Sequence, residues 1–198
     1  MKNRKPIILG GKILKQTLLI IDAQQELIEG NKEEQGVFEK EKIVTNINTV
    51  IEKAINEDIP VVFIRDLDVS HGEGPGFQIH RDIKVPSTAI IFDKAATNSF
   101  YGTPLHEHLS ENNVDHIVIM GCKTEHCIDS AVRTATINHF DVTLVGDGHS
   151  TSDSKNLSAN QIILHHNETL HGHYNVDNFS LVRNSNEDLF TPVHNNYR

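Results

Sequence analysis

A cysteine at the junction of a strand and a helix is the residue of this sequence best suited to chemistry. Cys127 lies in the segment GCKTEHCIDSAVRTA, which follows an apolar run ending at Met120 and continues with apolar residues at helical spacing. Cys127 is therefore predicted in the first turn of a helix, where free N–H groups and the helix dipole favour a thiolate. The same N–H groups are able to hold an oxyanion. We interpret Cys127 as a candidate nucleophile, the alternative being a small buried apolar residue.

Two charged residues end apolar strands elsewhere in the chain. Asp22 closes the segment LLIID, and Lys94 closes IIFDK. A carboxylate at the end of a buried strand costs energy unless it is paired. Asp22 is either the N-cap of the following turn or a base that takes the thiol proton and later passes it to a leaving group. Lys94 is either a surface residue or a cation that keeps Asp22 ionised and favours the thiolate.

The second cysteine, Cys122, lies just beyond the strand that precedes the helix of Cys127. We interpret it as a residue that supplies backbone geometry. A redox pair with Cys127 is the alternative, although a disulfide across a strand-to-helix turn is geometrically unfavourable. Two cysteines are too few for a secreted disulfide scaffold and are typical of a reducing compartment.

The elements that would position these residues alternate between strands and helices. Apolar patterning predicts strands at 17–22, 61–66, 88–93, 116–121, 141–146 and 178–183, and helices at 40–57, 102–112, 125–139 and 155–172. Such alternation predicts a three-layer α-β-α fold with a six-stranded, mainly parallel sheet. The segment 67–87, rich in Gly, Pro, Asp and His, is predicted to be a loop without secondary structure that serves as a lid or pocket wall.

Ligand sites of such sheets lie at the carboxyl ends of the strands. Several residues that end predicted strands are polar, and because parallel strands end at one edge we expect them to converge there. They are Asp22, Asp66, Asp93 with Lys94, Cys122 and Asp147.

Composition limits the classes of function. The 198 residues fit one domain, predicted at 17–198, preceded by an N-terminal arm at 1–16. A net charge of −9 without a basic stripe argues against nucleic acid and anionic membranes as partners. No apolar run is long enough to span a bilayer, and Gly10, Gly11 and Lys12 interrupt the N-terminal apolar stretch that would resemble a signal peptide. We expect a cytoplasmic protein.

The arm carries five large apolar side chains, and exposed apolar patches mark interfaces. We therefore expect a homo-oligomer, with an arm folded back on its own subunit as the alternative. The five residues are Ile7, Ile8, Leu9, Ile13 and Leu14.

Several segments in a fixed order resemble the isochorismatase-like cysteine hydrolase superfamily. They are LLIIDAQQ, VVFIRD, GFQIH, IIFDKAATNSFYGTPLHEHL, VIMGCKTEHCIDSAVRTA and the aspartate of LVGDGHS. The resemblance as a whole spans residues 17–171. The superfamily includes isochorismatases, nicotinamidases, N-carbamoylsarcosine amidohydrolases and streptothricin-type hydrolases, and its members are commonly dimers or tetramers.

This resemblance implies a catalytic triad of Cys127, Asp22 and Lys94. It also implies a cis peptide bond between Cys122 and Lys123, and an oxyanion hole made by the N–H groups of Lys123 and Cys127. The pocket of a small-molecule substrate is then predicted to be lined by Gln24, Phe77, Phe100 and Tyr101.

The resemblance also bears on metal and reaction. Nicotinamidases bind a metal through an Asp-x-His motif and a later histidine, whereas this chain has Asp66-Leu67-Asp68 followed by His71 and His80. We therefore expect a metal-independent, cofactor-free enzyme that cleaves an amide C–N bond through a thioester on Cys127. The alternatives are a vinyl-ether hydrolase of the isochorismatase type, a metal-dependent amidase of the nicotinamidase type and a catalytically silent binding module.

Overall fold

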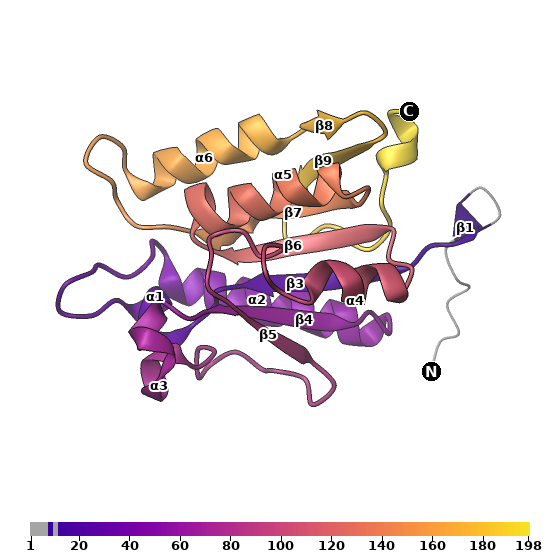
Figure 1. Cartoon of the computed structure of the whole chain (residues 1–198). Helices are drawn as coiled ribbons and strands as arrows, with labels where there is room; N and C mark the ends of the chain where they lie inside the picture. The colour runs from indigo at the N-terminus through magenta and orange to yellow at the C-terminus, as the bar shows by residue number, and fades with distance from the viewer. Residues whose placement is uncertain (1–7, 10–11) are drawn as a thin grey trace.

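Seven strands form the central sheet of the computed structural model, which describes residues 8–9 and 12–198. The sheet runs in the spatial order β5-β4-β3-β6-β7-β9-β8, and all neighbouring strands are parallel except β8 and β9. In chain order the strands are β3 (Gln16–Ile21), β4 (Val61–Asp66), β5 (Ile90–Lys94), β6 (His116–Cys122), β7 (Asp141–Ser150), β8 (Tyr174–Asn175) and β9 (Asn178–Arg183) (Figure 1).

Helices cover both faces of this sheet. They are α1 (Gln25–Glu29), α2 (Lys40–Asn56), α3 (Gly74–Phe77), α4 (Leu105–Glu111), α5 (Asp129–Ile137) and α6 (Ala159–Leu170), with the short turns η1 (Val69–Gly72), η2 (Thr124–Ile128) and η3 (His194–Asn196). One face packs against α2 and the chain after β9, and the other packs against α4, α5 and α6. Over the described ranges, none of these helices combines the length and apolarity that crossing a bilayer requires.

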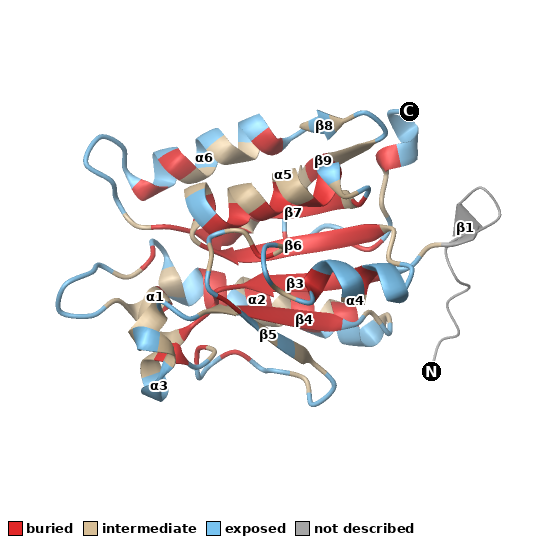
Figure 2. Ribbon diagram, in the orientation of Figure 1, coloured by how far each residue is buried: buried red, intermediate tan, exposed pale blue. Residues whose placement is uncertain are grey.

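The strand β3, which ends just before Asp22, is packed on both of its faces. Leu18 and Ile20 belong to the apolar cluster under α2, whereas Leu19 and Ile21 belong to the cluster under α4 and α5. All four side chains are fully buried, as the red central strands of Figure 2 show. Each such side chain contributes roughly 1.5–3 kcal/mol by leaving water. The continuous apolar run of β3 is therefore explained by burial on two faces, and it gives the following residue a rigid support.

The chain order of the strands creates a crevice at the carboxyl edge of the sheet. From the central strand β3 the chain passes to β4 and β5 on one side, and then returns through α4 to β6 on the other side of β3. Connections leave the edge in opposite directions at such a switch point, and ligands of open α/β sheets bind there.

The three-layer arrangement with a mainly parallel sheet confirms the predicted fold class, but the sheet has seven strands instead of six. The additional strand, β8, has two residues and pairs antiparallel with β9, so it is too short to show a periodic pattern. The segment 67–87 contains the turns η1 and α3, contrary to the prediction of a loop without secondary structure. The helix predicted at 125–139 begins one residue earlier, with a π turn, η2.

The N-terminal arm is shorter than predicted, because Gln16 already pairs within β3. The backbone of β1 (Ile8–Leu9) pairs antiparallel with that of β2 (Lys12–Ile13), and this pair is separate from the central sheet (Figure 1). Ile7 lies outside the described residues. The expectation that the arm contacts another subunit stays a prediction.

Candidate active site

Three residues from three segments meet at the carboxyl edge of the sheet. Asp22 follows β3, Lys94 ends β5, and Cys127 lies in the turn that follows β6. Lys94 Nζ lies 3.0 Å from Asp22 Oδ2 and 3.4 Å from Cys127 Sγ. All three residues are nearly removed from solvent, with exposed fractions of 1%, 1% and 8% for Asp22, Lys94 and Cys127. The structure thus brings the predicted triad residues together.

Asp66 is a fourth member of this group, and the sequence had indicated it only as one of several polar strand ends. Asp66 and Lys94 are register partners on β4 and β5, and the Lys94 ammonium bonds the Asp66 carboxylate. This signal was present in the sequence, since both residues end neighbouring strands, but it required the register. Asp147, also expected at this edge, instead accepts hydrogen bonds from the backbone and hydroxyl of Ser185 at 2.6 and 2.8 Å.

The donor atoms of Asp22, Asp66 and Cys127 lie within 4.8 Å of one another, as the ligands of a metal ion would. However, the ammonium of Lys94 contacts all three groups. A divalent ion bound by these three residues would be repelled by the ammonium. It would also have to break the ion pairs of Lys94 with Asp22 and Asp66. Asp22, Asp66 and Cys127 therefore do not fit a metal ion.

The backbone at the end of β3 has an unusual conformation. Asp22 has a φ of +50°, in the left-handed region that aspartate tolerates better than most residues. Beside it, Gly121 of β6 has a φ of +127°, and a Cβ at this position would lie 1.9 Å from the carbonyl oxygen of Ile21. Only glycine allows this close approach of the two strands. Strain of this kind is found at functional sites, where the surrounding structure holds it.

The turn that carries Cys127 is a π turn, not the regular helix that the sequence predicts. The carbonyl oxygen of Lys123 accepts hydrogen bonds from the N–H groups of His126 and Ile128, both at 3.2 Å. In a regular α-helix the Cys127 N–H would donate to this same carbonyl. Among the described residues, the Lys123 carbonyl does not accept this bond. The peptide bond between Cys122 and Lys123 is cis.

A buried histidine fixes this turn from below. His149 Nδ1 lies 2.9 Å from Thr124 Oγ1, and His149 Nε2 lies 2.9 Å from Asn167 Oδ1. Asn167 Nδ2 donates to the carbonyl of Gly146, so Asn167 Oδ1 accepts a hydrogen bond from His149 Nε2. The unprotonated Nδ1 of His149 then accepts a hydrogen bond from the Thr124 hydroxyl. Burial lowers the pKa of His149 to about 4. The ring therefore holds the turn as a neutral imidazole.

The charges of the site depend mainly on burial. Burial raises the pKa of Asp22 to about 6, against the opposing effect of Lys94. Burial, with the charge of Asp22 adding to it, raises the pKa of the Cys127 thiol to about 12. Burial disfavours the charged form of Lys94, but its acidic neighbours outweigh this effect and raise the pKa of Lys94 above its ordinary value. At neutral pH the site holds a carboxylate, a thiol and an ammonium.

These shifts correct the expectation that the helix terminus makes Cys127 a resting thiolate. The helix terminus adds a partial positive charge, but burial and the Asp22 carboxylate oppose the thiolate more strongly. A reactive thiolate would therefore need a nearby base that accepts the Cys127 proton. A base with a pKa near 6 is suited to this task at neutral pH.

A cavity of about 700 Å³ opens above these residues, a size typical of small-molecule sites. Asp22, Asp66 and Cys127 line it together with Lys123, one of the two residues predicted for the oxyanion hole. His71 lines the cavity as well. His80 does not, because it is buried beside α1, where its Nε2 lies 3.0 Å from Glu29 Oε1.

The four residues predicted as pocket walls do not line this cavity, contrary to the prediction. Gln24 is fully buried, and its amide bonds the backbone of Asp66 and Phe77. Phe77 packs under the guanidinium of Arg65, 4.3 Å from its ring centroid. Phe100 stacks on Phe140 in the core, and Tyr101 is 74% exposed. Gln24 and Phe77 thus support the site from behind.

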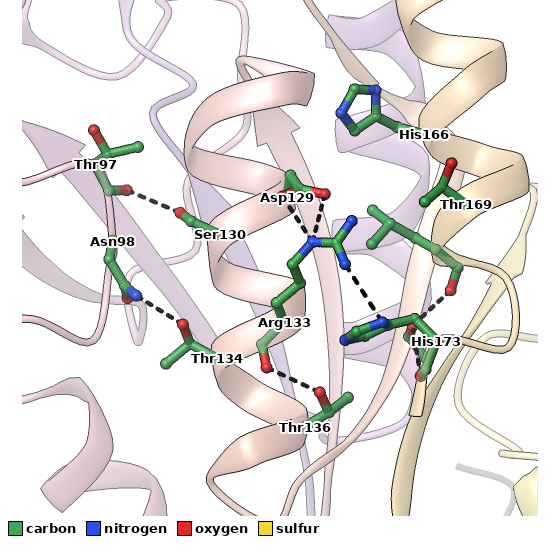
Figure 3. A network of polar contacts seen from close by, with 12 residues as sticks. Thr97, Asn98, Asp129, Ser130, Arg133, Thr134, Thr136, His166, Thr169 and His173 are labelled. Carbon is green, nitrogen blue, oxygen red and sulfur yellow. Dashed lines mark hydrogen bonds and ion pairs between the residues drawn. The ribbon is translucent and has the colours of Figure 1, made fainter. Parts of the chain in front are cut away.

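One wall of the cavity is fixed to α5 by polar contacts (Figure 3). Asn98 Nδ2 donates to Thr134 Oγ1 at 2.7 Å, and the Ser130 hydroxyl donates to the carbonyl oxygen of Thr97 at 3.4 Å. Thr97 lines the cavity. The segment between Lys94 and α4 is thereby held against the helix that follows Cys127.

The two cysteines lie on opposite faces of the sheet. Cys122 packs in the cluster under α2, and Cys127 packs in the cluster under α4 and α5. Burial raises the pKa of the Cys122 thiol above its ordinary value. Because the sheet separates the two side chains, their geometry does not support the redox-pair alternative.

Comparison with known proteins identifies relatives in sequence and in fold. The sequence model of the isochorismatase domain matches residues 16–163. The uncharacterized isochorismatase family protein YrdC of Bacillus subtilis is 28% identical over 138 residues, which are 67% of this chain and 72% of YrdC. Streptothricin hydrolase of Streptomyces noursei is 24% identical over 70% of this chain and 55% of its own length. A crystal structure of an isochorismatase from Pseudomonas putida superimposes with a TM-score of 0.75 at 25% identity and covers 93% of both chains.

Proposed function

The chain belongs to the isochorismatase family of hydrolases, and we propose that it cleaves the C–N bond of a small amide through a thioester on Cys127. The observation that carries this proposal is the position of the Lys94 ammonium, which contacts both Asp22 and the Cys127 sulfur. One family member that this chain resembles bears the name streptothricin hydrolase.

The first half of the reaction forms the thioester. The Asp22 carboxylate takes the proton of the Cys127 thiol, and Lys94 stabilises the thiolate that results. The sulfur then attacks the amide carbonyl carbon, and the oxygen becomes an oxyanion that the N–H groups of Lys123 and Cys127 stabilise. When the C–N bond breaks, protonated Asp22 gives its proton to the departing nitrogen. Ammonia or an amine leaves, and Asp22 is a carboxylate again.

The second half removes the acyl group. Asp22 takes a proton from a water molecule, whose oxygen attacks the thioester carbonyl. The C–S bond breaks, the carboxylic acid leaves, and the sulfur recovers its proton from Asp22. One base thus serves both halves of the reaction, which fits a carboxyl group whose pKa burial raises to about 6.

The alternatives fit these residues less well. A binding module has no need for a buried carboxylate with a raised pKa beside a thiol, since such perturbed groups gather at catalytic sites. A vinyl-ether hydrolase of the isochorismatase type would leave Cys127 without a role. A metal-dependent amidase of the nicotinamidase type would bind its metal through Asp66, Asp68, His71 and His80, but His80 is buried with its Nε2 3.0 Å from Glu29 Oε1 and does not line the cavity.

The proposal is tested by a screen of small amides and isochorismate with the Cys127→Ala variant as control. Release of ammonia or amine should require Cys127, and quenching should trap an acyl group on it. Trypsin cleaves after Lys123 and Arg133, so the peptide 124–133 carries Cys127 without Cys122. Isochorismate hydrolysis that survives in Cys127→Ala would contradict the proposal. Loss of activity on chelation would instead support the metal-dependent alternative.

A further inference from the structure

We propose that the amide cleaved at this site carries a positively charged group, and that Glu26 is the carboxylate that binds it. This inference rests on the function proposed above and adds the charge of the substrate. It follows from the side chains that line the cavity, from how Glu26 is held, and from a buried carboxylate in the cavity whose oxygens lack regular hydrogen bonds.

The cavity lining is strongly acidic. Its six carboxylates belong to Asp22, Glu26, Glu33, Glu34, Asp66 and Asp68, and Lys123 is the one lysine or arginine among the lining residues. Lys94, below the cavity, pairs with Asp22 and Asp66, and Lys123 Nζ lies 3.6 Å from Glu34 Oε2. Among the described residues, Glu26, Glu33 and Asp68 have no lysine or arginine partner. A cleft lined by one sign of charge concentrates ligands of the opposite sign.

Glu26 differs from the other two because neutral groups hold it in place. Its Oε1 accepts a hydrogen bond from Asn31 Nδ2 at 2.8 Å, and its Oε2 accepts one from the Ser70 hydroxyl. These bonds, with that from Ser70 the stronger, lower the pKa of Glu26 below its ordinary value, and the charge of His71 has a smaller effect in the same direction. Neither donor carries a charge. The carboxylate is therefore fixed and ionised, and its negative charge remains available to a cation.

The backbone around Glu26 is arranged for this position. Ser70 and His71 both adopt left-handed conformations, with φ of +50° and +54°, which residues with side chains rarely adopt. Gly76 leaves the space that the pair requires, because a Cβ there would lie 2.1 Å from Ser70 Oγ and 2.6 Å from Glu26 Oε2. Three segments, α1, η1 and α3, thus meet around one carboxylate.

An independent observation indicates a ligand in the same cavity. Neither carboxylate oxygen of Asp22 has a hydrogen bond of regular geometry among the described residues, although Asp22 is 1% exposed, lines the cavity and lies beside the Lys94 ammonium and the Cys127 thiol. A buried oxygen without a regular hydrogen bond is costly, and a bound N–H group would supply one. The scissile nitrogen of an amide is such a group, so the reacting end of the substrate lies at Asp22 and its cationic end at Glu26.

The charge of the cavity also excludes a class of substrates. Isochorismate carries two carboxylates, and both would enter a cavity whose unpaired charges are negative. Like charges brought together without a counter-ion oppose binding. The same feature that favours a cationic amide therefore disfavours isochorismate.

The first test measures the electrostatic potential at Cys127 without relying on hydrolysis. Two methanethiosulfonate reagents are compared, one with a trimethylammonioethyl group and one with a sulfonatoethyl group. Each rate of modification of Cys127, followed on the peptide 124–133, is divided by the rate of the same reagent with free 2-mercaptoethanol. We expect the cationic reagent to be favoured by about tenfold or more, as several uncompensated charges in a cleft produce.

Variants assign this preference to Glu26. Glu26→Gln retains the size and the capacity to bond Ser70 and Asn31, and it should lower the ratio by about threefold or more. Glu52→Gln, an exposed site on α2 outside the cavity, removes the same charge and should leave the ratio unchanged. A ratio of one in the unaltered protein, or a ratio that Glu26→Gln does not change, would overturn the inference.

The second test compares three amides of similar length: 6-aminohexanamide, which is a cation, heptanamide, which is neutral, and 5-carbamoylpentanoate, which is an anion. The cation should have the highest kcat/KM, by about tenfold, and Glu26→Gln should remove most of this advantage. Faster hydrolysis of the neutral or anionic amide would overturn the inference and leave the amidase function intact. If no amide is cleaved while the reagent ratio holds, the amidase proposal fails and the preference for cations stands.

Discussion

The two edges of the central sheet both bury polar side chains, but they do so in different ways. At the carboxyl edge, Asp22, Asp66 and Lys94 are charged groups around a thiol, and both carboxylate oxygens of Asp22 lack a well-formed hydrogen bond. At the amino edge, the buried groups are neutral and most of their polar atoms are bonded to one another. This difference separates the residues that hold the fold from those that we propose carry out the reaction.

The amino edge is built around His116, the first residue of β6. Its Nδ1 lies 2.8 Å from Gln16 Oε1 and its Nε2 lies 2.8 Å from Thr143 Oγ1, while Gln16 Nε2 donates to the carbonyl oxygen of Phe190. His194 lies against the His116 ring and bonds the backbone of β7, although its Nδ1 has no partner. Burial lowers the pKa of His116 well below its ordinary value. This network joins three strands and the C-terminal segment.

The comparison teaches that burial alone does not identify a functional residue. His116 is as deeply buried as Asp22 and Lys94, but its hydrogen bonds are satisfied within the fold. At the carboxyl edge, the carboxylate oxygens of Asp22 lack regular hydrogen bonds, and Asp22 lines a cavity. Buried polar groups that remain unsatisfied require another explanation, and for Asp22 we propose that this explanation is a bound substrate.

The largest expected effect is the loss of turnover at the carboxyl edge. Asp22→Asn, Lys94→Ala and Cys127→Ala should each lower kcat/KM for an amide by roughly 10⁴-fold or more, and a double variant should lose little beyond a single one, because the groups act as a unit. Urea unfolding of Cys127→Ala should stay within about 1 kcal/mol of the parent, since few contacts are lost. Substantial turnover in any of the three variants would contradict the triad assignment.

Asp22→Asn should have the opposite effect on alkylation of Cys127. Asp22 raises the pKa of the thiol and Lys94 lowers it, so removal of the carboxylate should increase the thiolate fraction. Iodoacetamide should therefore modify Cys127 several-fold faster at pH 8 in this variant, and in both proteins faster than the fully buried Cys122. Slower alkylation of Cys127 in Asp22→Asn would count against this account of the thiol.

The amino edge should show the reverse pattern, with a loss of stability and not of activity. His116→Ala removes a buried ring and takes away the hydrogen-bond partner of Gln16 Oε1 and of Thr143 Oγ1, which should cost about 2–4 kcal/mol of unfolding free energy. The exposed His165→Ala on α6 is the matched control and should stay within about 0.5 kcal/mol. Urea denaturation measures both. A large fall in kcat/KM of the folded His116→Ala protein would remove the distinction between the two edges.

The smallest expected effect is a shift in the pH dependence of kcat/KM when Asp66 is replaced. Asp22 acts as a carboxylate, so the rate should rise with pH through about 6 as this group loses its proton. Asp66 raises the pKa of Asp22 by its charge and shares Lys94 with it. Asp66→Asn should therefore move the acid limb down by up to about one pH unit, which corresponds to about 1.4 kcal/mol.

Asp68→Asn is the control for this measurement, because Asp68 lines the same cavity but has no contact with Lys94 among the described residues. Its acid limb should remain near that of the parent. An acid limb that moves to higher pH in Asp66→Asn would contradict the shared use of Lys94.

Much of the carboxyl edge could be predicted from the sequence, because strand ends are local features. Apolar runs end at Asp22, Asp66 and Lys94, and parallel strands bring their ends to one edge. The bond between Asp66 and Lys94 required the register of β4 and β5, which no local pattern specifies.

Side-chain direction was harder to predict than strand position. Phe77, Phe100 and Gln24 lie near the site in the chain, but each side chain points into the protein, where packing partners distant in sequence decide its place. The sequence analysis did not predict the acidic lining of the cavity, to which Glu26, Glu33 and Asp68 belong, for the same reason. No local pattern distinguishes Glu26 from other residues of a short helix, because the bonds that hold it come from Ser70 and Asn31.

The separation of the two cysteines by the sheet has a consequence under oxidative stress. Oxidation of Cys127 would first give a sulfenic acid. Recovery begins when a second thiol condenses with it to form a disulfide and water, and reduction of that disulfide completes the recovery. Cys122 packs on the other face of the sheet and is unable to serve as that thiol without rearrangement of the strand that carries it. Recovery of Cys127 would therefore depend on a thiol from outside the chain, such as a small cellular thiol, and its rate on whether that molecule is able to enter an acidic cavity.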